Sequence, residues 1–185
     1  MEDLKSMLNR MGKTLEDDTE RLEAKVSMLM TVPDRIEIEN LMKTMVWAMD
    51  SGDKELWLGI WGDDIHYVVP QYDVDIRGRK AVEEFAEISI FTREARRFSS
   101  LSNIMIDVKG DTATGRDYYF HYGYAVDQET GKASAERATA EGKHFYQFRR
   151  KDGVWKITGM EVYVHRLDEE ATGEAADESQ HQGRA

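Results

Sequence analysis

Residues 111–127 read DTATGRDYYFHYGYAVD, and this stretch decides the fold. It follows a turn at residues 109–111 and runs through β-branched and aromatic residues without a break, which predicts one long β-strand. Because side chains alternate between the two faces of a strand, one face carries Asp117, Tyr119, His121 and Gly123. That face sets a carboxylate and an imidazole among aromatic rings, which is a candidate acid–base surface. The alternative is a core histidine with one satisfied hydrogen bond.

Three further segments after Arg97 repeat the period-two pattern, at residues 98–108, 142–150 and 154–165. Turns at residues 109–111 and 151–153 join neighbouring strands as hairpins. The residues before Arg97 follow helical spacing instead, apart from a strand at residues 64–70 that ends at a proline. Helices first and long strands afterwards predict an α+β domain, in which a curved antiparallel sheet wraps over helices as a cone and encloses a pocket.

Apolar residues at three- and four-residue spacings predict the helices of the first half. The helix at residues 3–30 has one apolar stripe, interrupted at Asp18, made of Leu4, Leu8, Met11, Leu15, Leu22, Val26 and Leu29. Further helices are expected at residues 33–50 and 54–61 and from Gly78 onward. The stripe of the first helix either packs on its own domain or makes an oligomer contact.

These patterns divide the chain into three parts. We expect an N-terminal helical extension over residues 1–32 and a single domain over residues 33–167. Residues 168–185 have low hydrophobicity and many charges, so we expect a disordered acidic tail there.

Composition excludes several classes of function. The 185 residues carry a formal net charge of −11, which argues against nucleic acid or an anionic membrane surface as a partner. The chain has no cysteine, which excludes thiolate nucleophiles, disulfides and Cys-type zinc sites. No apolar run approaches the roughly 18 residues of a membrane helix, and no signal-peptide pattern is present, so we expect a cytoplasmic protein.

Five short segments resemble one known family by their order and spacing. They are AMDSGDKELW (48–57), DDIHYVVP (63–70), RGRKAVEEF (77–85), LSNIMIDVKGDTATGRDYY (101–119) and DGVWKI (152–157). Together they look like the SnoaL-like branch of the NTF2-like superfamily. The resemblance implies a cone-shaped α+β domain with a deep pocket that binds a small molecule, in a homo-oligomer (dimer or trimer). Its members include dehydratases, isomerases, cyclases and lyases that work without cofactors, and also non-catalytic subunits.

The resemblance also implies site residues. The aspartate that the family's dehydratases carry on the first helix of the domain falls on Asp50, and a catalytic position of the central strand falls on His121. Two positions depart from the pattern. The helix tyrosine of the bile-acid dehydratase matches Met45, and the histidine expected ahead of the LSN segment falls near Phe98 and Ser99. The chain should therefore not use the family's acid–base pair unchanged.

His121 is the best candidate for a catalytic base, because histidine exchanges protons near neutral pH without much tuning. Asp50 would orient its imidazole and stabilise the protonated form, although an aspartate in a turn sequence can instead bond backbone amides. Tyr119, on the same face of the strand as His121, would assist as a phenol donor.

The remaining candidates would bind the substrate. By the family pattern His144 and Tyr146 face inward from the strand 142–150, with His144 as a substrate contact or proton relay. Tyr67 and Trp47 would supply donors and flat walls for an aromatic substrate, or fill the core. Arg97 would bind an oxyanion or phenolate, or belong to a solvated turn. Two histidines and a carboxylate could bind a metal, but no short-range ligand spacing is present, so we expect no metal and no other cofactor.

We therefore expect a cofactor-independent lyase that acts on an aromatic, phenolic or polycyclic small molecule. It would remove water or, by a retro-aldol step, a small aldehyde such as formaldehyde. Three alternatives stay open: an isomerase or cyclase of the same family, a module that only binds a small molecule, and the non-catalytic small β subunit of an aromatic ring-hydroxylating dioxygenase. The last is disfavoured because the chain lacks the longer arginine-rich insertion of those subunits.

Overall fold

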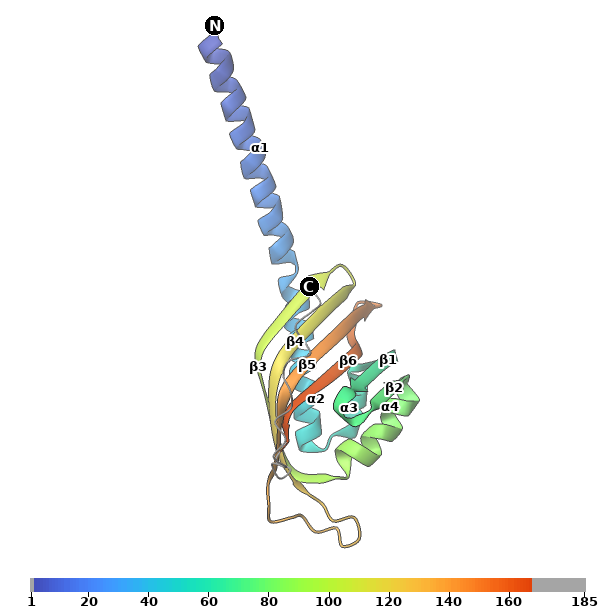
Figure 1. Ribbon diagram of the computed structural model, residues 1–185. Coiled ribbons are helices and arrows are strands. Elements are labelled where there is room, and N and C mark those ends of the chain that lie inside the picture. Colours follow the sequence, from blue (N-terminus) through green and yellow to red (C-terminus); the bar gives the residue numbers. More distant parts are fainter. Residues whose placement is uncertain (1, 168–185) are drawn as a thin grey trace.

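The computed structural model describes residues 2–167, so the predicted acidic tail at residues 168–185 lies outside the described residues. In chain order the elements are α1 (Glu2–Met30), α2 (Val32–Ser51), α3 (Lys54–Gly59), β1 (Trp61–Val69), η1 (Pro70–Tyr72), β2 (Val74–Arg77), α4 (Arg79–Ala86), η2 (Glu87–Phe91), β3 (Glu94–Lys109), β4 (Thr112–Ala125), β5 (Ala138–Lys151) and β6 (Val154–Leu167). Figure 1 shows α2, α3 and α4 inside the curve of one sheet, while α1 projects away from it. This is the α+β architecture predicted from the sequence.

One six-stranded sheet has the order β2-β1-β6-β5-β4-β3. Neighbouring strands are antiparallel except β1 and β6, which run parallel. The four long strands predicted from Arg97 onward are confirmed, whereas β2 and η1 have no counterpart in the sequence prediction. Two register shifts in β3 coincide with left-handed backbone at Arg96 and Asn103, where φ is 50° and 53°. Bulges of this kind bend a strand, so they contribute to the curvature of the sheet.

The short helix α3 differs from its prediction. It begins as expected, because Asp53 accepts a 2.9 Å hydrogen bond from the backbone nitrogen of Leu56 and so caps the helix. It ends at Gly59, and Trp61 lies on β1 rather than on the predicted helix 54–61. Glycine is the poorest helix former after proline, which accounts for the early end. Trp57 and Trp61 still meet, with ring centroids 4.9 Å apart.

The core lies between α2 and the inner face of the sheet. Ile38, Met42 and Met45 of α2 are buried there, and burial of each such side chain contributes about 1.5–3 kcal/mol. Asp34, in the first turn of α2, accepts a 3.0 Å hydrogen bond from the indole nitrogen of Trp155 and pairs with Arg150 at 2.6 Å. These contacts fix the start of α2 against the β5–β6 hairpin, where Trp155 is buried in the core.

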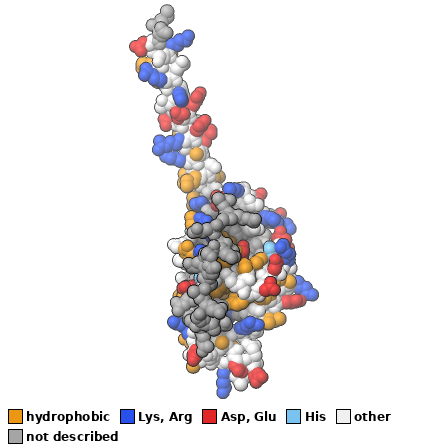
Figure 2. Space-filling view, viewed as in Figure 1, with side chains coloured by type: hydrophobic (Ala, Val, Ile, Leu, Met, Phe, Trp, Pro, Cys, Tyr) orange, Lys and Arg blue, Asp and Glu red, His pale blue; other side chains and the backbone are white. Residues whose placement is uncertain are grey.

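Helix α1 stands apart from this core. The side chains of its apolar stripe are each more than half exposed, and Figure 2 shows hydrophobic side chains at the surface of the projecting helix. Leu8, Leu15, Leu22 and Leu29 follow one another at seven-residue intervals, the spacing of a coiled-coil seam. Within residues 2–167 no other element covers this stripe. None of the described helices is long and apolar enough to cross a membrane.

Candidate active site

A cavity of about 140 Å³ lies between the helices and the inner face of the sheet. Its apolar wall includes Met45 and Met49 of α2 and Trp57 of α3, so the methionine-rich stripe of α2 serves both the core and the cavity. The hydroxyl and imidazole groups that line it belong to Tyr67, Ser99, Tyr119, His121 and His144. A small apolar cavity with a few convergent polar groups is typical of a ligand site.

His121 belongs to a chain of hydrogen bonds that starts at the end of α2. Asp50 accepts a hydrogen bond from the backbone nitrogen of Ser99 at 2.6 Å and another from Ser99 Oγ at 2.8 Å. Ser99 Oγ lies 2.8 Å from His121 Nδ1, and Glu94 Oε2 lies 2.7 Å from His121 Nε2. Asp50 therefore reaches His121 through a serine, and both nitrogens of the imidazole have partners.

The protons of this chain can be assigned by counting donors. Ser99 has a single hydroxyl proton, and when that proton points to Asp50, His121 Nδ1 must donate to Ser99 Oγ. The hydrogen bond from His121 lowers the pKa of Glu94, burial opposes the shift, and the positive charges of His121 and Arg97 add to it. An ionised Glu94 accepts a hydrogen bond from a protonated His121 Nε2. All three hydrogen bonds are thus satisfied when His121 is an imidazolium between two carboxylates.

A second polar cluster surrounds His144. The side chains of Asp117 and His144 are 0% and 7% exposed. Tyr146 donates its hydroxyl proton to Asp117 Oδ2 at 3.0 Å, and its oxygen lies 3.0 Å from His144 Nδ1. The same Nδ1 lies 2.9 Å from Asp117 Oδ1. Burial, and then the charge of Asp117, raises the pKa of Tyr146, so its hydroxyl stays protonated. Both His144 and Tyr146 are buried, but only His144 lines the inner cavity.

Two tyrosines present phenol groups to the cavity. Burial raises the pKa of Tyr67 to about 12, and burial followed by the charges of neighbouring groups raises that of Tyr119 further. Both phenols therefore stay protonated at neutral pH and can donate a hydrogen bond. Tyr119 also stacks on His144, with ring centroids 4.2 Å apart and planes 6° apart. For neither hydroxyl does the described part of the chain offer a hydrogen-bond partner, so both are left for a ligand.

Three predicted substrate contacts, Tyr146, Trp47 and Arg97, are not among the residues that line the inner cavity. Trp47 is 71% exposed, because two residues along a helix turn by about 200°, and Met45 already faces the core. Its predicted place in the cavity wall is therefore wrong. Arg97 does not line the cavity either. Its guanidinium donates a 2.6 Å hydrogen bond to the carbonyl of Ile90 and lies over the ring of Phe91, 5.6 Å from the ring centroid. Arg97 thereby links β3 to the π-helical segment η2, whose Ile90 lines the cavity.

Sequence reasoning missed two residues of this site, Ser99 and Glu94. A signal for Ser99 was present, because it occupies the region where the family's histidine is expected and is absent. Glu94 lies before the strand predicted at residues 98–108, whereas β3 already begins at Glu94, so no pattern placed it near His121.

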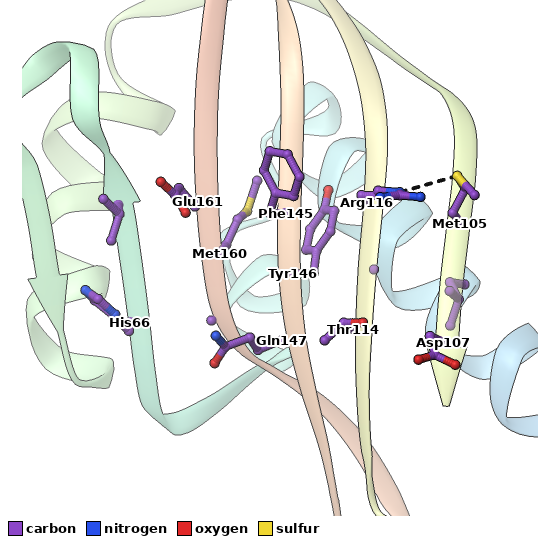
Figure 3. Close-up of a pocket in the computed structure, with 14 residues that line it drawn as sticks. His66, Met105, Asp107, Thr114, Arg116, Phe145, Tyr146, Gln147, Met160 and Glu161 are labelled. Atoms are coloured by element: carbon purple, nitrogen blue, oxygen red, sulfur yellow. Dashed lines mark hydrogen bonds between the residues drawn. The ribbon is translucent and has the colours of Figure 1, made fainter. Parts of the chain in front are cut away.

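A larger depression of about 680 Å³ lies on the outer face of the sheet. Figure 3 shows Arg116, Met105 and Phe145 among the side chains around it. Met105 and Phe145 are 54% and 40% exposed, and the one histidine there, His66, pairs with an exposed Asp75 at 2.8 Å. This open surface brings no buried acid–base groups together, so the smaller inner cavity is the better candidate site. Among residues 2–167 no three His, Asp or Glu side chains gather in a way that could bind a metal ion.

The sequence pattern of the SnoaL-like domain matches residues 30–161. The chain belongs to the SnoaL-like domain family. The match covers the helices and strands that build the cavity, and the NTF2-like fold expected from the sequence is confirmed. No curated protein matches this SnoaL-like chain.

Several solved structures share the fold. A type 2 hexachlorocyclohexane dehydrochlorinase (LinA) is 16% identical, with a TM-score of 0.66 over 82% of this chain and 98% of its own. A candidate scytalone dehydratase from Novosphingobium aromaticivorans is 20% identical, with a TM-score of 0.65 over 84% and 97%. A candidate aromatic ring hydroxylase from the same organism is 24% identical, with a TM-score of 0.63 over 74% and 92%. Identities this low show a common fold.

Proposed function

We propose that this SnoaL-like protein is a cofactor-independent lyase that uses acid–base catalysis in the inner cavity. The observation that carries the proposal is the arrangement of His121, which faces a small apolar cavity and connects to Asp50 through Ser99 and to Glu94 directly. A lyase of this kind must move a proton between the substrate and the protein, and a histidine supported by carboxylates does so at neutral pH.

The phenols of Tyr67 and Tyr119 would assist the reaction. Loss of water or of an aldehyde from a phenolic compound places negative charge on an oxygen in the transition state. Neutral phenol donors that the fold already holds in place stabilise such a charge without first having to reorganise. The raised pKa values of both tyrosines keep their protons in place for this purpose.

The size of the cavity limits the substrate. An engineered protein cavity of roughly 150 Å³ holds one benzene molecule, so a cavity of about 140 Å³ suits one aromatic ring with small substituents. Flat neighbours such as Trp57, Tyr119 and the ring of His144 favour an aromatic ligand. A single-ring phenol is thus a better fit than the polycyclic alternative.

Two of the structural neighbours are named for eliminations, whereas a third is named as an aromatic ring hydroxylase. Dehydrochlorination and dehydration are both eliminations, in which a proton and a leaving group depart from neighbouring atoms. Both names belong to other proteins with this fold. They support an elimination over isomerisation for this chain and leave its leaving group to experiment.

We also propose that the chain forms a homo-oligomer through α1. A helix of 29 residues whose leucines recur every seven residues, and which no described element covers, gains stability by burying that stripe against another copy. Asp18 interrupts the stripe, which limits the length of the contact.

Turnover by metal-stripped protein tests the proposal. A panel of single-ring phenolic diols and bicyclic analogues is incubated with wild type, His121→Gln and His66→Gln, the last a matched control on the outer face. Conversion that falls about 10²–10⁴-fold in His121→Gln and persists in His66→Gln supports the lyase. Binding without conversion by wild type would instead identify a binding module.

A further inference from the structure

The two histidines of the cavity differ in how many carboxylates they meet. Each connects to one carboxylate through a hydroxyl: His121 to Asp50 through Ser99, and His144 to Asp117 through Tyr146. His121 has a second carboxylate, Glu94, at its other nitrogen. Within the described residues, His144 has no such partner at Nε2.

The hydroxyl between histidine and carboxylate fixes which nitrogen carries a proton. The single hydroxyl proton of Tyr146 forms the hydrogen bond to Asp117, so the phenol oxygen accepts a hydrogen bond from His144 Nδ1. Asp117 Oδ1 lies 2.9 Å from the same nitrogen; it accepts no hydrogen bond from the described residues, but a carboxylate oxygen this near favours a proton on Nδ1. When His144 is neutral, this arrangement leaves the lone pair on Nε2. The same count gives His121 a proton on both nitrogens, because an ionised Glu94 accepts a hydrogen bond from Nε2.

The strand register places both imidazoles on one wall. Asp117 lies opposite His144, Tyr119 opposite Gly142, and His121 opposite Ala140. Tyr119 therefore separates the two histidines, and it stacks on the ring of His144. Four residues along a strand span roughly 13 Å between Cα atoms, so side chains that lean inward from both ends can reach one small substrate.

We propose that His144 is the general base of the reaction, that His121 is the general acid, and that Asp117 is a positioning residue for the base. The proposal rests on the proposed lyase function. In an elimination the lone pair on His144 Nε2 takes a proton from carbon, the C–H electrons form the double bond, and the C–O bond breaks. The leaving oxygen takes a ring proton from His121. Water leaves, and one proton has moved from His121 to His144, to be returned through solvent.

Heteronuclear NMR of the imidazole nitrogens tests this assignment without a substrate. Spectra of the full chain at neutral pH are compared for wild type, His144→Gln and His121→Gln, whose missing signals assign the two rings. Should either variant fail to fold, two-dimensional correlations within each ring of wild type make the assignment. We expect His144 neutral with the proton on Nδ1, and His121 protonated on both nitrogens. A proton on Nε2 of His144, or a neutral His121, would overturn the proposal.

Two conservative variants separate positioning from packing. Asp117→Asn should shift His144 to a mixture of tautomers, whereas Tyr146→Phe should retain the Nδ1 proton because Asp117 Oδ1 remains 2.9 Å away. Equal spectra for Asp117→Asn and wild type would show that Asp117 does not position the imidazole of His144.

Kinetics with any compound that the panel test converts complete the experiment. His144→Gln should lose at least 100-fold in kcat, and unchanged kcat there contradicts the base assignment even if the lyase itself stands. If no panel compound is converted, the lyase proposal fails, while the NMR result still decides whether the two rings differ in protonation.

Discussion

Replacing Ser99 by alanine cuts the connection between Asp50 and His121 while leaving both in place. The substitution removes the hydroxyl that bonds Asp50 and His121, each at 2.8 Å. The hydrogen bond from the backbone nitrogen of residue 99 to Asp50 remains, because alanine keeps that donor. Alanine is also smaller than serine, so no clash arises.

The expected cost follows from the two lost hydrogen bonds. Hydrogen bonds to charged groups contribute about 1.5–3 kcal/mol each when nothing replaces them. Water can reach this site, since His121 and Glu94 side chains are 16% and 31% exposed, and it offsets part of the loss. We expect the free energy of unfolding to fall by about 2 kcal/mol, which lowers Tm by about 4–8 °C. Because Asp50 no longer stabilises the imidazolium, we expect kcat to fall about 10–100-fold.

Thermal unfolding and turnover of Ser99→Ala are measured beside Ser100→Ala. Ser100 is exposed on the opposite face of the same strand and is the matched control. Ser100→Ala should resemble wild type in both measurements. If Ser99→Ala keeps both wild-type stability and the doubly protonated NMR signature of His121, Asp50 has no influence on the ring through Ser99.

Four further predictions follow from other contacts. Glu94→Gln should be less stable than wild type at neutral pH. Because the pKa of Glu94 is lowered in the folded state, its contribution to stability is complete above the ordinary glutamate pKa of about 4.3 and disappears as pH falls through the lowered value. In urea unfolding at several pH values, the difference in stability between Glu94→Gln and wild type should therefore vanish in acid. Gly142→Ala should lower the free energy of unfolding by about 3 kcal/mol or more, since the new Cβ would lie 1.8 Å from the carbonyl oxygen of Tyr163. The control Gly12→Ala in α1 meets nothing within 4 Å and should not destabilise the protein. Thermal melts compare the two variants. Leu15→Lys with Leu22→Lys should lower the oligomeric state in sedimentation velocity without unfolding the domain, and an unchanged state would exclude α1 as the contact. Tyr67→Phe should reduce kcat/KM about 10-fold with little change in Tm, and an equal rate would remove the phenol from the mechanism.

Periodicity predicted the long strands of this protein well because each strand contains many repeats of the two-residue alternation. The stretch 111–127 became β4, and its inner face carries Asp117, Tyr119 and His121 as alternation requires. The four-residue strand β2 is too short to show a repeat. The left-handed residues Arg96 and Asn103 change the register of β3 in ways that no average propensity reveals.

The site was less predictable than the fold because its contacts join distant segments. Asp50 and His121 were expected to meet directly, yet a serine from a third element lies between them. Glu94 is 27 residues from His121 in sequence and lies beside it only because β3 extends past its bulge at Arg96. The prediction for Trp47 was wrong for a simpler reason: the presence of an aromatic residue on a helix says little about which way that position faces.

The most direct test of the account is the turnover of metal-free protein whose cavity has been filled. Ala140 lines the cavity opposite His121, and Ala140→Leu would occupy much of the 140 Å³ without altering an acid–base group, at a cost of about 1–3 kcal/mol in stability. Wild type should keep its full rate in chelator, and folded Ala140→Leu should lose at least 100-fold. An equal rate in Ala140→Leu, or loss of wild-type turnover in chelator, would contradict a cofactor-independent reaction in this cavity.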